Sequence, residues 1–187
     1  MVKYHQTSMP LSLSDIESLI SQFKKENSDG EVGLTDLSQE ELYKIRRSKV
    51  LVLNENQFNT LHDKIKDFVL EVAENIFEEF NIFDLSLQVT EYDHSYEGFY
   101  DWHKDAPEYQ DGTPLGNRIL SFSVLLNNSR EYEGGEFELK DIELRNFTKQ
   151  TDMIMFYSNL EHRVAPVLSG SRYSLVGWLS GIGKNNA

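Results

Sequence analysis

The sequence predicts a mixed α+β fold in which a helical first part packs on an antiparallel β-sandwich or barrel. Up to about residue 80, apolar residues recur at helical spacing, whereas later segments are short and alternate apolar with polar residues. No helix-length periodic segment separates the later strands, which disfavours a parallel α/β sheet. At 187 residues, the chain is long enough to form one domain with a sizeable core.

Three helices are expected in the first part. Ser14 with Glu17 and Ser38 with Glu41 have the spacing of capping boxes, which open helices. The third and clearest helix follows Asn54, because a long apolar stripe begins there and charged residues cover the opposite side. The stripe consists of Phe58, Leu61, Ile65, Phe68, Val69, Val72, Ile76 and Phe80. These helices are expected to back a sheet.

Six or more short strands are expected in the second part. The alternation of Leu85, Leu87 and Val89 with polar residues indicates the first strand. Further candidates are residues 117–127, 135–144, 151–158, 162–168 and 172–180, with turns expected at 127–128, 134–135 and 169–170. The segment 104–117 is rich in Pro, Gly and Asp and is a candidate lid.

Composition narrows the classes of function. The net charge of −13 and the pI near 4.8 disfavour a nucleic-acid partner, because phosphate binding needs a basic surface. The chain has no cysteine, so any metal must be held by nitrogen and oxygen atoms. No apolar run is long enough to span a bilayer and the amino terminus has no signal-peptide core, so a cytoplasmic protein without a membrane partner is expected.

Four residues suggest a metal site. His103 and Asp105 lie two positions apart, so on an extended strand both side chains would point to the same face. His162 begins a later strand-like segment, and a hairpin at 169–170 would bring it into the same cavity as Arg172. Two histidines and one carboxylate can bind one face of Fe(II) and leave three positions open. Because an arginine can clamp a carboxylate bidentately, the set describes a site for a metal and a chelating dicarboxylic acid.

Each of these residues has a simpler interpretation when taken alone. An isolated His162 could be a core or turn histidine, and an isolated Arg172 could be a surface or salt-bridge residue. The ordered combination at compatible spacing favours the metal site. The other histidines, His5, His62 and His94, have no patterned partners and are interpreted as surface or structural residues.

Three segments, residues 92–105, 117–139 and 152–178, resemble the Fe(II)- and 2-oxoglutarate-dependent dioxygenases, specifically the prolyl 4-hydroxylase-like branch. The shared motifs are, in order, His-x-Asp, Gly-Gly-Glu, His-x-Val-x-Pro-Val, Gly-x-Arg and a Trp six positions after that Arg. The resemblance implies a double-stranded β-helix (jelly roll) core with flanking N-terminal helices. It also implies a single domain over 1–187, with a helical lead-in over about 1–80 and a catalytic core over about 81–183.

The resemblance assigns roles to individual residues. The iron ligands of the family correspond to His103, Asp105 and His162. The basic residue that pairs with the C5 carboxylate of 2-oxoglutarate corresponds to Arg172, and the tyrosine that lines the co-substrate pocket corresponds to Tyr92. Two aromatic residues of the pocket correspond to Tyr100 and Trp178. Some members of the branch carry a second pocket tyrosine. No tyrosine occurs at the corresponding stretch here, where Ser121 or Ser123 would replace it.

The implied function is hydroxylation of a C–H centre, foremost a prolyl residue of a peptide or protein substrate. Fe(II) would be the cofactor, 2-oxoglutarate and O2 the co-substrates, and ascorbate a candidate reductant. Three alternatives stay open: a same-fold oxygenase acting on a free amino acid or other small molecule, a nucleic-acid demethylase, and a non-enzymatic jelly-roll binding module. The missing second arginine after Arg172 and the acidic composition disfavour the demethylase.

Overall fold

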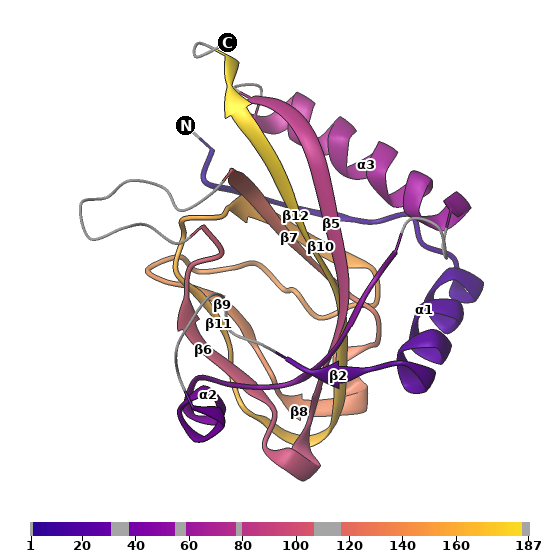
Figure 1. The fold of residues 1–187 in the computed structure, drawn as a ribbon, viewed down its shortest axis with the longest axis vertical. Coiled ribbons are helices and arrows are strands. Elements are labelled where there is room, and N and C mark those ends of the chain that lie inside the picture. Colours follow the sequence, from indigo (N-terminus) through magenta and orange to yellow (C-terminus); the bar gives the residue numbers. More distant parts are fainter. Residues whose placement is uncertain (1, 31–37, 55–58, 78–79, 107–116, 185–187) are drawn as a thin grey trace.

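The computed structural model describes residues 2–30, 38–54, 59–77, 80–106 and 117–184. Within these ranges, the chain folds into two antiparallel sheets and three α-helices (Figure 1). The elements are β1 (Tyr4–Ser8), α1 (Leu13–Lys25), β2 (Ser28–Asp29), α2 (Gln39–Ile45), β3 (Arg46–Arg47), β4 (Lys49–Val52), α3 (Asn59–Phe77), β5 (Phe80–Asp93), η1 (His94–Tyr96), β6 (Phe99–His103), β7 (Arg118–Leu125), η2 (Ser129–Glu131), β8 (Tyr132–Gly134), β9 (Phe137–Leu139), β10 (Asp152–Tyr157), β11 (His162–Val164) and β12 (Val167–Gly183).

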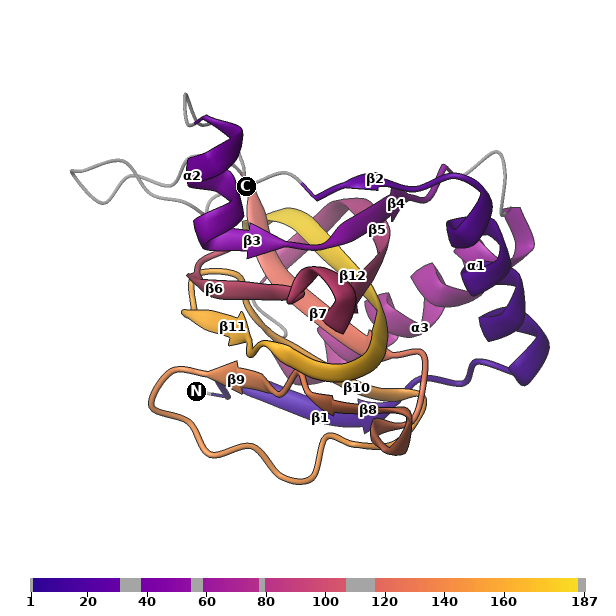
Figure 2. The same cartoon turned by 90° about the horizontal axis from the view of Figure 1, so that it is seen from below.

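The two sheets form the double-stranded β-helix that the family resemblance implies. The larger sheet has the order β1-β10-β7-β12-β5-β4-β2, with β8 paired to one end of β12. The smaller sheet has the order β3-β6-β11-β9. Figure 2 shows the smaller sheet on one side of the larger sheet and helices α1 and α3 on the other. The space between the two sheets is therefore the interior of the jelly roll.

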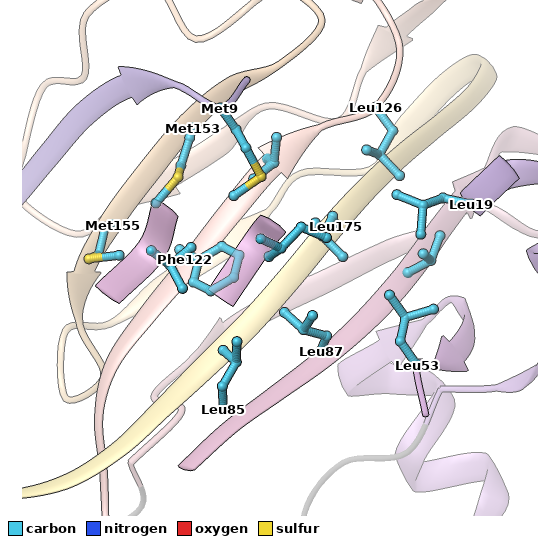
Figure 3. Close-up of a cluster of buried hydrophobic side chains, with 14 of the residues drawn as sticks. Met9, Leu19, Leu53, Leu85, Leu87, Phe122, Leu126, Met153, Met155 and Leu175 are labelled. Carbon is cyan, nitrogen blue, oxygen red and sulfur yellow. The ribbon is translucent and has the colours of Figure 1, made fainter. Parts of the chain in front are cut away.

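The main hydrophobic core lies between the larger sheet and helices α1 and α3. The helices contribute one buried face each, including Leu19 from α1 and Val69 from α3, both fully buried. The sheet contributes the alternating inward residues of its strands, among them Leu87, Phe122 and Leu175 (Figure 3). This packing holds the larger sheet as a rigid base, and the face opposite the helices is free to carry a site.

The structure corrects the predicted start of the first helix and leaves that of the third undescribed. The first helix begins at Leu13, and its capping box joins Ser12 to Asp15 rather than Ser14 to Glu17. The shorter aspartate side chain reaches the Ser12 N–H at 2.8 Å and therefore does what glutamate does in the usual motif. The second capping box, Ser38 with Glu41, is confirmed. The start of the third helix after residue 54 lies outside the described residues.

Several predicted strands differ in length from those observed. The first runs over Phe80–Asp93, so Phe80 belongs to a strand and not to the helical stripe. Strands β1 to β4 were not expected, because each is short and pairs with a partner distant in sequence. Residues 162–168 divide between β11 and the start of β12.

The predicted lid is described only at its ends, since residues 107–116 lie outside the described ranges.

The expected hairpin at 169–170 is wrong. Strand β12 continues through Gly170, whose φ of 71° bends it without reversing it. Before this bend, β12 pairs with β8, and after it the strand pairs with β5 and β7. A bend suffices because the strand only has to pass from one side of the jelly roll to the other.

No helix in the described ranges is long and apolar enough to cross a membrane.

Candidate metal centre

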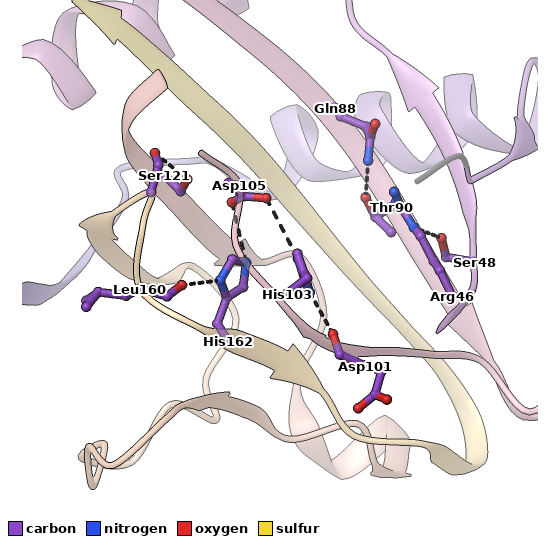
Figure 4. Close-up of polar contacts among 11 residues, drawn as sticks. Arg46, Ser48, Gln88, Thr90, Asp101, His103, Asp105, Ser121, Leu160 and His162 are labelled. Carbon is purple, nitrogen blue, oxygen red and sulfur yellow. Dashed lines mark hydrogen bonds and ion pairs between the residues drawn. The ribbon is translucent and has the colours of Figure 1, made fainter. Parts of the chain in front are cut away.

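Three potential metal ligands converge at one end of the smaller sheet. His103 ends β6, His162 begins β11, and the two residues are direct partners in the antiparallel register. Asp105 lies 3.7 Å from Nε2 of His103 and 3.4 Å from Nε2 of His162, measured to its carboxylate oxygens. One ligand atom from each residue lies within 4.8 Å of the others, which is the spacing that a single metal ion requires (Figure 4).

Asp105 reaches this position differently from the way the sequence suggests. Strand β6 ends at His103, so strand alternation does not place the carboxylate. The backbone N–H of Asp105 instead donates to the carbonyl of Ser158 at 2.9 Å, and this bond draws the chain back over the site. The hydroxyl of Ser121 lies 2.8 Å from the hydroxyl of Ser158 and is one of the groups that lower the pKa of Asp105.

Backbone carbonyls orient both imidazoles. Nδ1 of His103 lies 2.7 Å from the carbonyl of Asp101, and Nδ1 of His162 lies 3.0 Å from the carbonyl of Leu160. With Nδ1–H donating to each carbonyl, Nε2 of both rings is left as the free nitrogen, and it faces Asp105 (Figure 4). Such bonds to the second nitrogen are the usual support of metal-binding histidines.

The charge states suit a divalent cation. Burial, and after it the charge of the neighbouring His162, lower the pKa of His103 to about 4, so the ring is neutral near pH 7. Burial on its own would raise the pKa of Asp105, but His162, His103 and the Ser121 hydroxyl together hold it well below its usual value. The site therefore offers neutral imidazole nitrogen and an ionised carboxylate, which are the protonation states that metal binding needs.

All seven predicted site residues line one pocket between the two sheets. They are Tyr92, Tyr100, His103, Asp105, His162, Arg172 and Trp178. Of the two serines expected to replace a missing tyrosine, Ser123 lines this pocket, whereas the hydroxyl of Ser121 lies against that of Ser158 outside the pocket lining. The three remaining histidines lie apart from the pocket lining, and one of them, His62, is buried in α3.

Arg172 is buried in the pocket with unused hydrogen-bonding capacity. Its side chain is 1% exposed, and Nη1 donates to the hydroxyl of Ser174 at 3.2 Å. Nε and Nη2 have no hydrogen-bond partner. A buried guanidinium is costly unless an anion meets it. Tyr92, its partner in the β5–β12 register, lies with its ring centroid 5.8 Å from Cζ of Arg172. The arrangement fits a bound carboxylate.

The Gly-Gly-Glu motif makes room for this arginine. Gly134 and Gly135 both have positive φ, a conformation that favours glycine. A Cβ atom at Gly135 would lie 3.0 Å from Cδ of Arg172, closer than side chains normally pack. The second glycine of the motif therefore leaves space for the aliphatic part of the Arg172 side chain.

Sequence reasoning missed Arg46, which lines the same pocket from β3. Its side chain is 8% exposed, and Nε donates to the hydroxyl of Ser48 at 2.7 Å. Its Cζ lies 4.7 Å from the ring centroid of Tyr100. The one available signal was the two-residue spacing of Arg46 and Ser48, which is too common to single out an arginine.

Comparison with known proteins identifies the family. The model of the 2OG-Fe(II) oxygenase superfamily matches residues 87–180, about half of the chain. The chain belongs to this superfamily. Its oxygenases use Fe(II), 2-oxoglutarate and O2. The donor set of His103, Asp105 and His162 and the unpartnered nitrogens of Arg172 fit that metal and that co-substrate.

Curated relatives match the oxygenase over part of their length. A PKHD-type hydroxylase of Synechococcus sp. (strain CC9605) is 36% identical over 83 residues, which cover 43% of this chain and 36% of the relative. A PKHD-type hydroxylase of Hyphomonas neptunium is 33% identical over 90 residues, covering 47% of this chain and 40% of the relative. The matches thus span well under half the length of these relatives.

Solved structures share the fold over nearly the whole chain. A viral collagen prolyl hydroxylase from Paramecium Bursaria Chlorella virus-1, solved with 2OG, has a TM-score of 0.74 at 21% identity and covers 97% of both chains. A prolyl hydroxylase from Trichoplax adhaerens, in complex with a hypoxia inducible factor peptide fragment, has a TM-score of 0.73 at 16% identity. That alignment covers 95% of this chain and 83% of the other. These likenesses establish a prolyl-hydroxylase-like jelly roll.

Proposed function

We propose that this oxygenase is an Fe(II)- and 2-oxoglutarate-dependent hydroxylase that acts on a prolyl residue of a peptide or protein. One observation carries the proposal: three convergent ligands share a pocket with a buried arginine whose Nε and Nη2 are unpartnered. The prolyl substrate class is supported by the named activities of proteins with the same fold. The chain would act as a single domain over residues 1–187.

The candidate ligands would hold iron on one face. His103 and His162 would bind through Nε2, and Asp105 through a carboxylate oxygen, because these atoms face one another. The carbonyls of Asp101 and Leu160 would keep both rings in the required orientation. When bound, iron and 2-oxoglutarate supply the oxidising power for C–H hydroxylation. The protein's own task is to orient the reactants and to exclude water.

Arg172 would pair with the distal carboxylate of 2-oxoglutarate. Its burial and its two unpartnered nitrogens allow bidentate contact, which lysine provides less well. Tyr92 would line the co-substrate's position, since burial raises its pKa and its phenol therefore stays protonated as a hydrogen-bond donor. Tyr100 and Trp178 would form apolar walls beside the substrate.

The decisive experiment incubates the purified protein with Fe(II), 2-oxoglutarate, ascorbate and a panel of prolyl peptides in air. Succinate formation and a peptide mass gain of one oxygen atom are expected together, and the His162→Ala variant should show neither. Succinate without peptide oxidation would keep the oxygenase and reject the substrate class. Absence of both 2-oxoglutarate binding and succinate formation would reject the proposed function.

A further inference from the structure

Two buried serine hydroxyls lie in contact near the candidate ligand Asp105. Ser121 on β7 is 1% exposed and Ser158, which follows β10, is 0% exposed. Their hydroxyl oxygens lie 2.8 Å apart (Figure 4). Neither serine belongs to the three candidate ligands or to the residues that line the pocket. Because burial of a polar group costs free energy unless it is hydrogen-bonded, the arrangement of this pair bears on what it does.

The contact leaves one hydroxyl hydrogen to be placed. A serine hydroxyl carries one hydrogen and accepts up to two. One serine donates to the other across the 2.8 Å contact, and the hydrogen of the accepting serine needs an acceptor of its own, because a buried donor without a partner is costly. The Ser121 hydroxyl is one of the groups that lower the pKa of Asp105, an effect that a hydroxyl has when it donates to an ionised carboxylate. The order Ser158 to Ser121 to Asp105 satisfies both hydrogens.

Ser158 also fixes the backbone that carries Asp105. Its carbonyl oxygen accepts from the N–H of Asp105 and from the N–H of Ala106, both at 2.9 Å. Its own N–H donates to the carbonyl of Ile119 on β7 at 3.0 Å. Ser158 therefore restrains Asp105 at the backbone, which leaves the orientation of the carboxylate to be set by other groups.

Ser121 occupies a rigid position in the larger sheet. Strand β7 is paired on both sides there, and Ser121 lies opposite Phe156 of β10 and Trp178 of β12. Its neighbours Leu120 and Phe122 are buried in the main core on the helix side of the sheet. Ser121 therefore points to the opposite face, which carries the site. A hydroxyl on so rigid a strand is well placed to fix the orientation of a nearby carboxylate.

The number of open metal positions limits how Asp105 can bind. Two histidines and one carboxylate leave three positions open on a six-coordinate metal, and 2-oxoglutarate and O2 are the co-substrates of this superfamily. Carboxylates bind metal ions through one oxygen or through both. Binding through both oxygens would take one of the three open positions. A hydrogen bond to one oxygen of Asp105 competes with the metal for that oxygen.

We propose that Ser121 and Ser158 are positioning residues that act through Asp105, an inference that rests on the proposed function, in which Asp105 is a metal ligand. Ser158 donates to Ser121, and Ser121 donates to one carboxylate oxygen of Asp105. The other oxygen is left for the metal, so Asp105 binds through a single oxygen and three positions stay open. Neither serine touches the metal or the substrate.

The test measures metal binding without turnover. The metal-free protein is titrated with Co²⁺, and both the affinity and the visible absorption bands of the bound ion are recorded, because these bands respond to the number and type of ligands. Ser121→Ala should bind Co²⁺ about tenfold more weakly, since the carboxylate is no longer oriented before the ion arrives. Its bands should also change, because the second oxygen of Asp105 is released. Ser121→Thr keeps the hydroxyl and should keep the bands of the wild type.

Ser158→Ala tests the order of the pair. Ser121 can still donate to Asp105 in this variant, so the loss of affinity should be smaller than in Ser121→Ala. The double variant should bind Co²⁺ as Ser121→Ala does, because the Ser158 hydroxyl acts only through Ser121. Both single variants lose the same contact between hydroxyls, so the metal-free proteins should unfold at similar denaturant concentrations.

A second hydroxyl pair provides the matched control. The exposed hydroxyls of Ser8 and Thr151 also lie 2.8 Å apart, and Ser8 is not among the pocket residues. Ser8→Ala should therefore leave the affinity for Co²⁺ and the absorption bands unchanged. If Ser121→Ala folds poorly, Ser158→Ala supplies the measurement, and unchanged affinity in that variant would overturn the role of the pair.

The outcomes separate the two proposals. Wild-type affinity and bands in Ser121→Ala, or losses that add up in the double variant, would each overturn the role of the serines while the wild type still binds metal. Failure of the wild type to bind Co²⁺, or undiminished binding by Asp105→Ala, would overturn the proposed function, which needs Asp105 as a ligand. The role of the serines would then fall with it.

Discussion

The ring of Tyr100 stacks on the imidazole of His103, with 3.4 Å between the ring centroids and 11° between the planes. Both residues lie on β6, and Nδ1 of His103 also lies 2.7 Å from the carbonyl of Asp101. The stack and the hydrogen bond together restrict both tilt and rotation of the imidazole. Nε2 therefore points towards the other ligands before any metal arrives, and such preorganisation favours metal binding.

Removal of the stack should weaken metal binding. We expect Tyr100→Ala to lower metal affinity about tenfold, because supports of this kind typically contribute that much or more. Tyr100→Phe keeps the aromatic ring and should bind metal almost as tightly as the wild type. Titration of the metal-free protein with Co²⁺ or Fe²⁺ gives the affinities. Equal affinities for all three proteins would show that the hydrogen bond to Asp101 alone orients the imidazole.

The metal-free protein should lose stability in mild acid through His103. Its pKa is about 4 in the folded state, against 6.5 ordinarily. Below about pH 6.5, His103 binds a proton in the unfolded chain but stays neutral in the folded chain. The free energy of unfolding therefore falls as the pH drops from about 6.5 towards 4. The free energy of unfolding falls by on the order of 3 kcal/mol over this pH range.

Denaturant unfolding of the metal-free protein at several pH values tests this dependence. His103→Asn should flatten the curve between about pH 4 and 6.5. A curve for His103→Asn that parallels the wild type would show that other groups govern the acid sensitivity.

Gly177 of β12 has no room for a side chain. It lies opposite Leu87 on one side and Phe122 on the other, and both partners are buried. A Cβ atom there would lie 2.9 Å from Cδ2 of Leu87 and would overlap the ring of Phe122. Gly177→Ala should therefore lower the free energy of unfolding by about 1–3 kcal/mol, as overpacking does. Ser180→Ala on the same strand is the control, and an unchanged unfolding midpoint for Gly177→Ala would contradict the packing argument.

The site was more predictable from the sequence than the sheets around it. His103 and Asp105 are local neighbours, and their ordered spacing to His162 and Arg172 is visible without a structure. Strand β1, in contrast, pairs with β10 almost the whole chain away, and no local periodicity marks so distant a partner.

Arg46 shows, within the site, the same limit of prediction from local sequence. It lies on a two-residue strand, and its burial comes from pairing with Tyr100, which lies more than fifty positions later in the chain. Its local sequence, rich in charged residues, is typical of an exposed helix end. Only the tertiary arrangement turns this arginine into the pocket, so a residue pattern could not distinguish it from the adjacent Arg47.

Arg172 separates co-substrate binding from metal binding. Its guanidinium contacts Ser174 and is not among the candidate metal ligands. We expect Arg172→Gln to weaken 2-oxoglutarate binding by more than about tenfold, because a charged pairing with a carboxylate is lost, while metal affinity stays within about twofold. Arg172→Lys keeps the charge and should fall between the two. His162→Ala should instead lose the metal and turnover together.

Calorimetry with 2-oxoglutarate and with metal, on the same preparations, measures both affinities. Succinate formation at saturating 2-oxoglutarate should recover substantially in Arg172→Gln, because the residue binds the co-substrate without being a ligand of the metal. Unchanged 2-oxoglutarate affinity in Arg172→Gln would show that another group, with Arg46 the first candidate, holds the distal carboxylate. Loss of metal in Arg172→Gln as severe as in His162→Ala would show that Arg172 supports the fold of the site and does not bind the co-substrate.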